Sequence, residues 1–274
     1  MIVVTGVSGA LGGSILDGLR AVEGLEVAGA SSSGDGRAVR HADFDRPETL
    51  EAAFSGARVL VFVSAGYAED DVVLARHGAV VRAAAEAGVE HVIYTSLAGS
   101  GERLTIALAH RWTEERLAAA PFDVTVLRNG LYAEIPAQLA ASGVPLAAGG
   151  GVFAAPLGEG RVSVVARDDL AAVAVRVAAE AWHDVVAGRA RRHAGRTYEL
   201  AGVASVGGHD LAEVLSEVLG RPVAYLAVPL GQARAALGGL PAYQAGHTIS
   251  TFANVGAGLL EAERSDLTAF LAAP

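Results

Sequence analysis

The feature that most limits the folds open to this chain is a glycine-rich turn close to its first residue. Residues 2–12 read Ile-Val-Val-Thr-Gly-Val-Ser-Gly-Ala-Leu-Gly, so a β-branched run leads into the spacing Gly-x-x-Gly-x-x-Gly. Gly6 lets the chain leave a strand sharply, Gly9 lets the backbone approach a pyrophosphate, and Gly12 lets helix and strand pack closely. Three glycines are weak evidence in a chain with 34 of them, but these lie between a clear strand and a clear helix.

This context predicts a turn that binds a nicotinamide dinucleotide. The pyrophosphate is expected at the helix N-terminus, where free N–H groups and the helix dipole stabilise negative charge. An ordinary tight turn is the alternative. The residues expected to contact the cofactor here are Gly6, Ser8, Gly9, Ala10, Leu11 and Gly12.

Strand-like and helix-like segments alternate through the first half of the chain. Strands are expected at Ile2–Thr5, Glu26–Ala30, Val59–Ser64, His91–Ser96 and Val124–Asn129, with a further one ending at residues 41–44. Helices are expected at Ala10–Ala21, Pro47–Phe54, Asp70–Ala87 and Ala107–Ala119. Repeated βαβ units with right-handed crossovers predict an α/β fold, a doubly wound parallel Rossmann-type sheet with helices on both faces.

The pattern loosens after Asn129. Residues 131–160 are rich in Gly, Ala and Pro, and we expect an irregular lid there. Regular elements return as helices at Arg167–Ala181 and 209–219 and as strands at Thr197–Leu200 and Val223–Val228. We interpret residues 1–130 as the NAD(P)-binding Rossmann core. Residues 131–274 would complete the sheet and add a small C-terminal substrate-binding lobe, in one continuous unit.

Composition excludes several kinds of chemistry. The chain has no cysteine, so disulfides, thiolate nucleophiles and Fe–S clusters are impossible, and we expect no metal. Its 21 basic residues are all arginine; without lysine, Schiff-base catalysis through a lysine is impossible. A net charge of −9 argues against a nucleic-acid partner.

The chain begins directly with a strand, without a preceding basic segment, and no apolar run reaches the length of a membrane span. We therefore expect a cytoplasmic protein that acts on a small molecule, without a nucleic-acid or membrane partner. A homodimer is one possible state.

The end of the second strand favours NADP(H) over NAD(H). Residues 30–37 read Ala-Ser-Ser-Ser-Gly-Asp-Gly-Arg, so the tip lacks the acidic residue that would bond the ribose hydroxyls and repel a 2′-phosphate. Ser31 and Ser32 can donate to that phosphate, and Arg37 or Arg40 lies within reach. Asp35 weakens this interpretation, although it falls beyond the expected tip.

The end of the third strand carries an acidic and an aromatic residue. Asp43 could bond the adenine amine, with Phe44 beside it as a further cofactor contact. Capping of the following segment is the alternative for Asp43.

Four further segments carry a resemblance to a known family. They read His-Ala-Asp-Phe-Asp at 41–45, Ala-Gly-Val-Glu-His-Val-Ile-Tyr-Thr-Ser at 87–96, Leu-Arg-Asn-Gly-Leu-Tyr at 127–132 and Arg-Thr-Tyr-Glu-Leu-Ala-Gly at 196–202. With the glycine turn they resemble the NmrA-like atypical short-chain dehydrogenases, and within these the type 2 NAD(P)H:quinone reductases. The resemblance covers roughly residues 1–230, and the last 45 residues match no motif.

Ordinary short-chain dehydrogenases deliver a proton through Tyr-x-x-x-Lys, a pair that a chain without lysine cannot form. His110 stands where the tyrosine would be, and Glu114 where the lysine would be. The resemblance to the quinone reductases implies this His-x-x-Thr-Glu spacing. We expect Glu114 to orient His110 from one turn away and His110, with a pKa near neutrality, to protonate a quinone oxygen. A surface ion pair on the helix is the alternative.

Residues at the ends of three neighbouring strands are expected to wall the nicotinamide pocket, because ligands bind at the carboxyl edge of such sheets. They are Ser64, Ala65, Thr95, Ser96, Asn129, Gly130 and Tyr132. Of these, Ser96 and Tyr132 are catalytic candidates together with His110. The expected cofactor contacts are Ser64, Ala65, Thr95 and Asn129. His77 receives no role, and Asp168 is interpreted as a helix-terminus residue.

The sequence thus predicts an NAD(P)H-dependent reductase of a quinone or similarly conjugated small carbonyl compound. Such a cofactor supplies the hydride, and the protein supplies binding and orientation. Two alternatives stay open: a non-catalytic NADP(H)-binding redox sensor, and a natural-product tailoring enzyme, such as an isomerase or dehydratase.

Overall fold

Seven parallel strands form the centre of the protein in the computed structural model, which describes residues 1–65 and 68–272. They are β1 (Ile2–Thr5), β2 (Val27–Ser31), β3 (Val39–His41), β4 (Val59–Val63), β5 (His91–Leu97), β6 (Asp123–Asn129) and β10 (Arg196–Leu200). Their order is β10-β6-β5-β4-β1-β2-β3, and each neighbouring pair is parallel. The doubly wound α/β prediction is confirmed, and the strand order reverses beside β1, where such sheets bind ligands.

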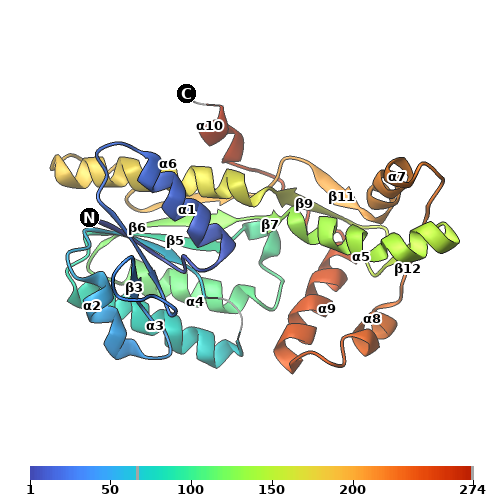
Figure 1. Ribbon diagram of the computed structural model, residues 1–274, viewed down its shortest axis with the longest axis horizontal. Helices are drawn as coiled ribbons and strands as arrows, with labels where there is room; N and C mark the ends of the chain where they lie inside the picture. Colours follow the sequence, from blue (N-terminus) through green and yellow to red (C-terminus); the bar gives the residue numbers. More distant parts are fainter. Residues whose placement is uncertain (66–67, 273–274) are drawn as a thin grey trace.

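The sheet is covered on both faces because successive side chains of a strand point in opposite directions. Ile2 and Val4 face a layer made of α1 (Ala10–Ala21) and α6 (Arg167–Val186). Val3 faces the opposite layer. That layer contains α2 (Leu50–Phe54, after a short 3₁₀ turn at Pro47–Thr49), α3 (Asp70–Glu86) and α4 (Ala107–Ala118). Figure 1 shows the sheet between these two helix layers.

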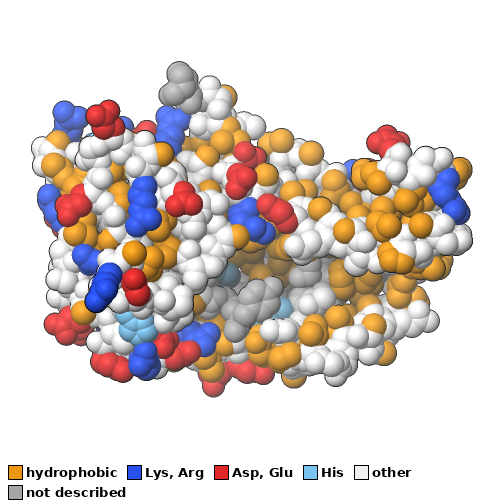
Figure 2. Space-filling view, viewed as in Figure 1, with side chains coloured by type: hydrophobic (Ala, Val, Ile, Leu, Met, Phe, Trp, Pro, Cys, Tyr) orange, Lys and Arg blue, Asp and Glu red, His pale blue; other side chains and the backbone are white. Residues whose placement is uncertain are grey.

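The chain builds a second lobe beside the sheet with most of the remaining elements. After a 3₁₀ turn at Gly99–Gly101, they are β7 (Leu131–Tyr132), α5 (Glu134–Gly150), β8 (Val152–Ala155), β9 (Arg161–Val165), β11 (Ser205–Gly207), α7 (Gly208–Leu219), β12 (Ala224–Ala227), α8 (Leu230–Ala236) and α9 (Ala242–Gly256). The last helix, α10 (Leu267–Leu271), packs on α6 instead. A separate apolar core around Phe153, Leu211 and Val255 holds this lobe together. Figure 1 shows α5, α7, α8 and α9 in it, and Figure 2 shows a hollow between this lobe and the Rossmann core.

The expectation of an irregular segment at 131–160 is wrong. Most of it is the 17-residue helix α5, which contains Pro145 and ends at Gly151 in the left-handed region (φ 68°). A Cβ at Gly143 would lie 2.6 Å from the ring of Phe153, so this glycine allows close packing inside the helix. The glycines that resemble a loop in sequence therefore serve helix packing and helix termination.

The chain returns from the second lobe to the main sheet through α6 and β10. A division of function at residue 130 stays a prediction. Among the described residues, no helix is both long enough and apolar enough to cross a membrane.

Two fully buried histidines, His77 and His91, should make the stability of the fold depend on pH. Burial lowers the pKa of His77 to about 3 and that of His91 to about 4, from an ordinary value of 6.5. Because the folded-state values are depressed, the unfolded chain binds more protons below pH 6.5, and stability falls as the pH decreases. We expect a loss of about 2 kcal/mol per histidine between neutrality and pH ~5.

Urea unfolding at the two pH values measures this loss. His91→Gln removes one titrating group and should reduce the pH dependence. A free energy of unfolding that is unchanged between the two pH values would contradict the neutral burial of these side chains.

Candidate functional site

The glycine turn has the geometry that its spacing predicts. Gly6 adopts a left-handed backbone (φ 65°), and the N–H of Gly9 donates to its carbonyl at 3.0 Å. A Cβ at Gly12 would lie only 2.3 Å from the carbonyl oxygen of Gly6 and 3.0 Å from that of Thr5. Helix α1 therefore begins directly against the end of β1, and its N-terminus opens toward the carboxyl edge of the sheet.

A cavity of about 350 Å³ lies on this turn. It is lined by Gly6, Gly9, Ala10, Leu11, Gly12, Phe44, Val63, Ser64, Ala65, Tyr132 and Arg167. The structure thus brings most of the predicted turn together with Phe44, the end of β4 and Tyr132. A cradle of glycines at a helix N-terminus fits the pyrophosphate of a dinucleotide, because neither bulk nor negative charge opposes it there.

Arg167 belongs to this cavity and was not predicted. It is the first residue of α6, and its guanidinium lies 5.1 Å from the centre of the Tyr132 ring. Its backbone N–H donates to Glu134 at 3.2 Å. An arginine next to the glycine turn adds positive charge where a pyrophosphate would lie. The pairing of β7 with β9, which brings Tyr132 opposite Val165, places this residue and is not visible in the sequence.

The remaining predicted cofactor contacts, Ser8, Ser31, Ser32, Arg37, Asp43, Thr95 and Asn129, lie outside the lining of this cavity. Ser8, Ser32 and Arg37 are exposed. Ser31 is buried beside Ser33, with 3.2 Å between their hydroxyl oxygens. Asp35 closes its own loop by accepting the N–H groups of residues 37–39 at 2.9–3.2 Å, and these hydrogen bonds lower its pKa.

The expectation that Arg40 reaches the 2′-phosphate is wrong. Its guanidinium donates to the carbonyls of Ala53 and Ser55, at 2.8 Å each, and lies 2.9 Å from the sulfur of Met1. Met1 precedes β1, so the guanidinium is at the amino edge of the sheet, opposite the glycine turn. A ligand on that turn is out of its reach.

Asp43 caps the segment that follows it, which is the second of its two interpretations. One carboxylate oxygen accepts the N–H of Asp45 at 3.0 Å, and the other accepts from Arg46 at 3.1 Å. Contact with an adenine amine stays a prediction.

Helix α4 presents His110 to the carboxyl half of β5, but not with the expected partner. Its Nδ1 lies 2.9 Å from the Tyr94 hydroxyl. Within the described part of the chain, Glu114 is hydrogen-bonded to Ser96, Arg111 and Arg128 and not to His110. Burial, and then the charge of Arg111, lower the pKa of His110 to about 4, while Glu114 opposes this shift. The expectations of a pKa near neutrality and of orientation by Glu114 are therefore wrong.

Glu114 is instead the centre of an ion-pair network. It accepts from Arg128 at 2.6 and 3.1 Å, from Arg111 at 2.7 Å and from the Ser96 hydroxyl at 2.5 Å. Arg128 also pairs with Glu199 at 3.0 Å. Burial alone would raise the pKa of Glu114, but the hydrogen bonds from Arg128 and Ser96 outweigh it, and the pKa is lowered.

Ser96 is not available as a catalytic group. It is 4% exposed, and its hydroxyl donates a hydrogen bond to Glu114. Its neighbour Thr95 is also buried, and its hydroxyl oxygen accepts the N–H of Ser64 at 3.0 Å. Asn129 is buried at the end of β6, and its Oδ1 has no hydrogen-bond partner among the described residues. Thr95 thus holds a cavity residue, Ser64, from behind, whereas Ser96 is bonded to Glu114.

Two further side chains of the site were missed from the sequence. Tyr94 reaches His110, and His77 contacts the end of β4, where its Nε2 lies 3.3 Å from the N–H of Ala65. Tyr94 lies within a quoted motif, which could have indicated it. His77 lies among apolar residues of a helix, where a histidine usually indicates core packing.

Helix α9 brings the second lobe beside α4. Thr105, just before α4, lies 2.6 Å from Nδ1 of His247, and its N–H donates to Ser250 at 3.1 Å. The helix that carries His110 is therefore held against the C-terminal lobe. This arrangement gives the last 45 residues a structural role that no motif indicates.

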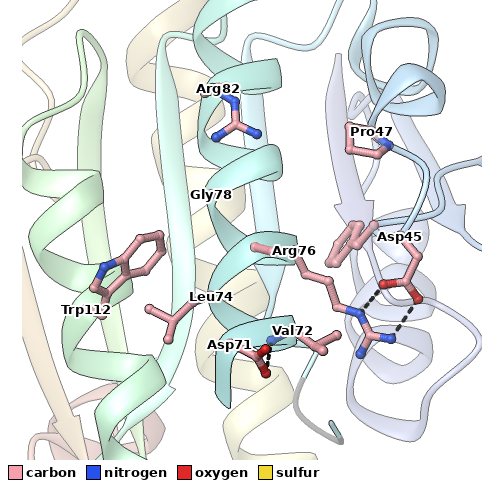
Figure 3. A pocket seen from close by; sticks show the side chains of 11 residues that line it. Asp45, Pro47, Asp71, Val72, Leu74, Arg76, Gly78, Arg82 and Trp112 are labelled. Atoms are coloured by element: carbon pink, nitrogen blue, oxygen red, sulfur yellow. Dashed lines mark hydrogen bonds and ion pairs between the residues drawn. The ribbon is translucent and has the colours of Figure 1, made fainter. Parts of the chain in front are cut away.

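A larger hollow of about 600 Å³ lies on the outer surface of α3 (Figure 3). It reaches from Asp45 and Pro47 across the helix to Trp112, and the carboxylate of Asp45 pairs with Arg76 through two contacts of 2.7 Å. It shares only Phe44 with the cavity on the glycine turn. The turn, rather than the size of a hollow, identifies the candidate site.

The fold and the glycine turn define a protein of the Rossmann class with a dinucleotide-binding loop. More specifically, the chain belongs to the NmrA-like family, whose model matches residues 1–262. Quinone oxidoreductase 2 of Escherichia coli is 32% identical over 235 residues, which cover 82% of this chain and 77% of that protein. The NAD(P)H azoreductase of Xenophilus azovorans is 29% identical over 72% of this chain and 64% of its own length.

Two solved structures have the same fold over nearly the whole chain. The triphenylmethane reductase of Citrobacter sp., complexed with NADP(H), superimposes with a TM-score of 0.85 at 28% identity, covering 99% of this chain and 95% of that one. The NADPH-dependent quinone oxidoreductase of Escherichia coli, complexed with NADPH, gives 0.85 at 29% identity, covering 100% and 95%.

We expect Gly9→Val to abolish dinucleotide binding without unfolding the protein. A Cβ at Gly9 would lie 3.3 Å from the Gly6 carbonyl oxygen, a tight contact that a shift of a few tenths of an ångström relieves. Gly9 lines the cavity, so we expect the larger valine side chain to take up space that a dinucleotide needs. Calorimetric titration with NADPH measures the loss. Gly149→Val, in α5 where a Cβ meets nothing within 4 Å, is the matched control and should bind normally. Unchanged affinity in a folded Gly9→Val protein would remove the cofactor from this turn.

Proposed function

We propose that this protein is an NADP(H)-dependent reductase of quinones or similarly conjugated small carbonyl compounds. One observation carries the proposal: the glycine turn and the end of β4 line one cavity, and α4 presents His110 to Tyr94 of the neighbouring strand β5 in a chain without lysine. The names of the relatives, a quinone oxidoreductase and an azoreductase, support a reductase of conjugated acceptors.

The choice of NADP(H) is supported by the tip of β2. Asp35, the acidic side chain in the loop after this tip, is occupied by its own loop, while Ser32 and Arg37 are exposed. These two side chains are the groups that we propose for the 2′-phosphate. Cytoplasmic location and formation of a homodimer stay predictions.

When bound, the cofactor supplies the hydride. The contribution of this chain is to orient both reactants and to stabilise the charge that develops on the acceptor oxygen. Burial raises the pKa of Tyr94 far above its usual value, so the phenol stays protonated and can donate to Nδ1 of His110. Nδ1 then accepts, and Nε2 carries the proton. We propose that this neutral N–H donates a hydrogen bond to the acceptor oxygen.

The function is tested by steady-state oxidation of NADPH against a benzoquinone, a naphthoquinone and a simple ketone. We expect turnover with the quinones, little with the ketone, and a lower KM for NADPH than for NADH. Tight binding of NADPH without turnover of any acceptor would favour the redox sensor. Turnover of a substrate without net oxidation of cofactor would favour the tailoring enzyme.

His110 should act as a neutral donor. His110→Leu is expected to lower kcat by roughly 10²-fold with little change in NADPH affinity, and His110→Gln, which keeps an N–H near the Nε2 position, should retain more activity. His209→Gln, on the exposed face of α7, is the control.

The pH profile separates the two possible roles of His110. Groups that face it are Tyr94 from β5, Arg111 and Glu114 from α4, and His77 from α3. With a folded pKa of about 4, His110 is uncharged at neutral pH and should cause a fall in kcat/KM only near that value. A titration near the ordinary histidine pKa that disappears in His110→Leu would instead identify an imidazolium proton donor.

A further inference from the structure

His77 is a buried polar side chain that the proposed chemistry does not use. It is fully buried on the inner face of α3, and its ring packs edge-on against Phe62 at 5.0 Å and against Tyr94 at 5.9 Å. Burial of a polar ring among aromatic side chains is unfavourable unless its nitrogens are hydrogen-bonded. Both nitrogens of this ring have partners.

The hydrogen bonds define which nitrogen carries the proton. The N–H of Ala65 donates to Nε2 at 3.3 Å, so Nε2 must be the unprotonated acceptor. Nδ1 lies 2.7 Å from the Thr113 hydroxyl, whose own proton goes to the Ala109 carbonyl at 2.7 Å. Nδ1–H therefore donates to Thr113, and the ring is neutral with one defined tautomer.

The atom that His77 holds is part of the cofactor cavity. The sheet ladder of β4 ends at Val63, so the next two backbone N–H groups need other acceptors. Thr95 accepts from Ser64, and His77 accepts from Ala65. Both Ser64 and Ala65 line the cavity opposite the glycine turn. The position of this wall thus depends on two side chains behind it.

We propose that His77 is a positioning residue for the dinucleotide: through its Nε2 it fixes the backbone of Ser64–Ala65 as the wall that faces the glycine turn, and Thr113 holds its ring in the required orientation. This inference rests on the proposed function, because it assumes that the cavity takes NADP(H). It does not make His77 a catalytic residue, since the ring lies behind the backbone and is fully buried.

The same arrangement explains the middle residue of the His-x-x-Thr-Glu segment. Residues at i, i+3 and i+4 share one face of a helix, and here each contacts a different partner. His110 contacts Tyr94, Thr113 contacts His77, and Glu114 accepts from Ser96. The segment therefore connects α4 to both β5 and α3, and Thr113 acts on the cofactor wall through His77.

The test compares NADPH dissociation constants and melting temperatures of His77→Leu, His77→Gln and Thr113→Val. His77→Leu leaves the Ala65 N–H without an acceptor and should weaken NADPH binding roughly tenfold or more. The glutamine Oε1 can accept in place of Nε2, so His77→Gln should restore much of the affinity. Thr113→Val should weaken NADPH binding less than His77→Leu does. It should also shift the emission spectrum of the bound NADPH.

His91→Leu is the matched control. His91 is also fully buried and also bonds a threonine, Thr125 at 2.8 Å, but it begins β5 at the opposite edge of the sheet. His91→Leu should lower the melting temperature and leave NADPH affinity unchanged. If His77→Leu behaves in the same way, or if it fails to fold and Thr113→Val binds NADPH as the wild type does, the proposal is overturned. Failure of the wild-type protein to bind NADPH would overturn the proposed function itself, and this role with it.

Discussion

The candidate site depends on how closely α1 approaches the end of β1. No side chain fits at Gly12, since its Cβ would lie 2.3 Å from the carbonyl oxygen of Gly6. This contact directs the N-terminus of α1, with its free N–H groups, at the point where the strand order reverses. On the other side, the side chain of Val63 lies 3.4 Å from where a Cβ of Gly6 would be, so the cleft is narrow and its second wall must also be fixed.

The second wall is fixed by polar side chains rather than by the ladder of the sheet. Thr95 of β5 and His77 of α3 supply them, and Thr113 of α4 orients His77, in a chain that lacks the Tyr-x-x-x-Lys pair of ordinary short-chain dehydrogenases. The positive charge nearest to His110 comes from Arg111, but Glu114 pairs with both Arg111 and Arg128. The network therefore cross-links α4 to β5 and β6 and leaves little free charge to activate a proton donor. A neutral imidazole beside a protonated tyrosine is consistent with such an environment.

The sequence revealed those parts of the structure that local patterns determine. Alternating strands and helices predicted the sheet, and the glycine spacing predicted five of the eleven residues that line the cavity. Helix α5 was missed because its glycines serve packing against Phe153 and helix termination, which look like loop signals. The partners of Arg40 and Glu114 were misassigned because long charged side chains bond to groups that only the tertiary fold brings near. Arg40 donates to the Ala53 carbonyl, and Glu114 accepts from Arg128. Burial, which sequence spacing does not report, decided the pKa of His110.

The most direct test of the account follows a single turnover. The protein is saturated with NADPH carrying deuterium at the transferable C4 position and mixed rapidly with a naphthoquinone, and the absorbance of the reduced nicotinamide is recorded. The account predicts complete oxidation of the bound cofactor, slower than with unlabelled NADPH, because the carbon–hydrogen bond breaks in the step observed. Bound NADPH that stays reduced in the presence of every quinone would contradict it.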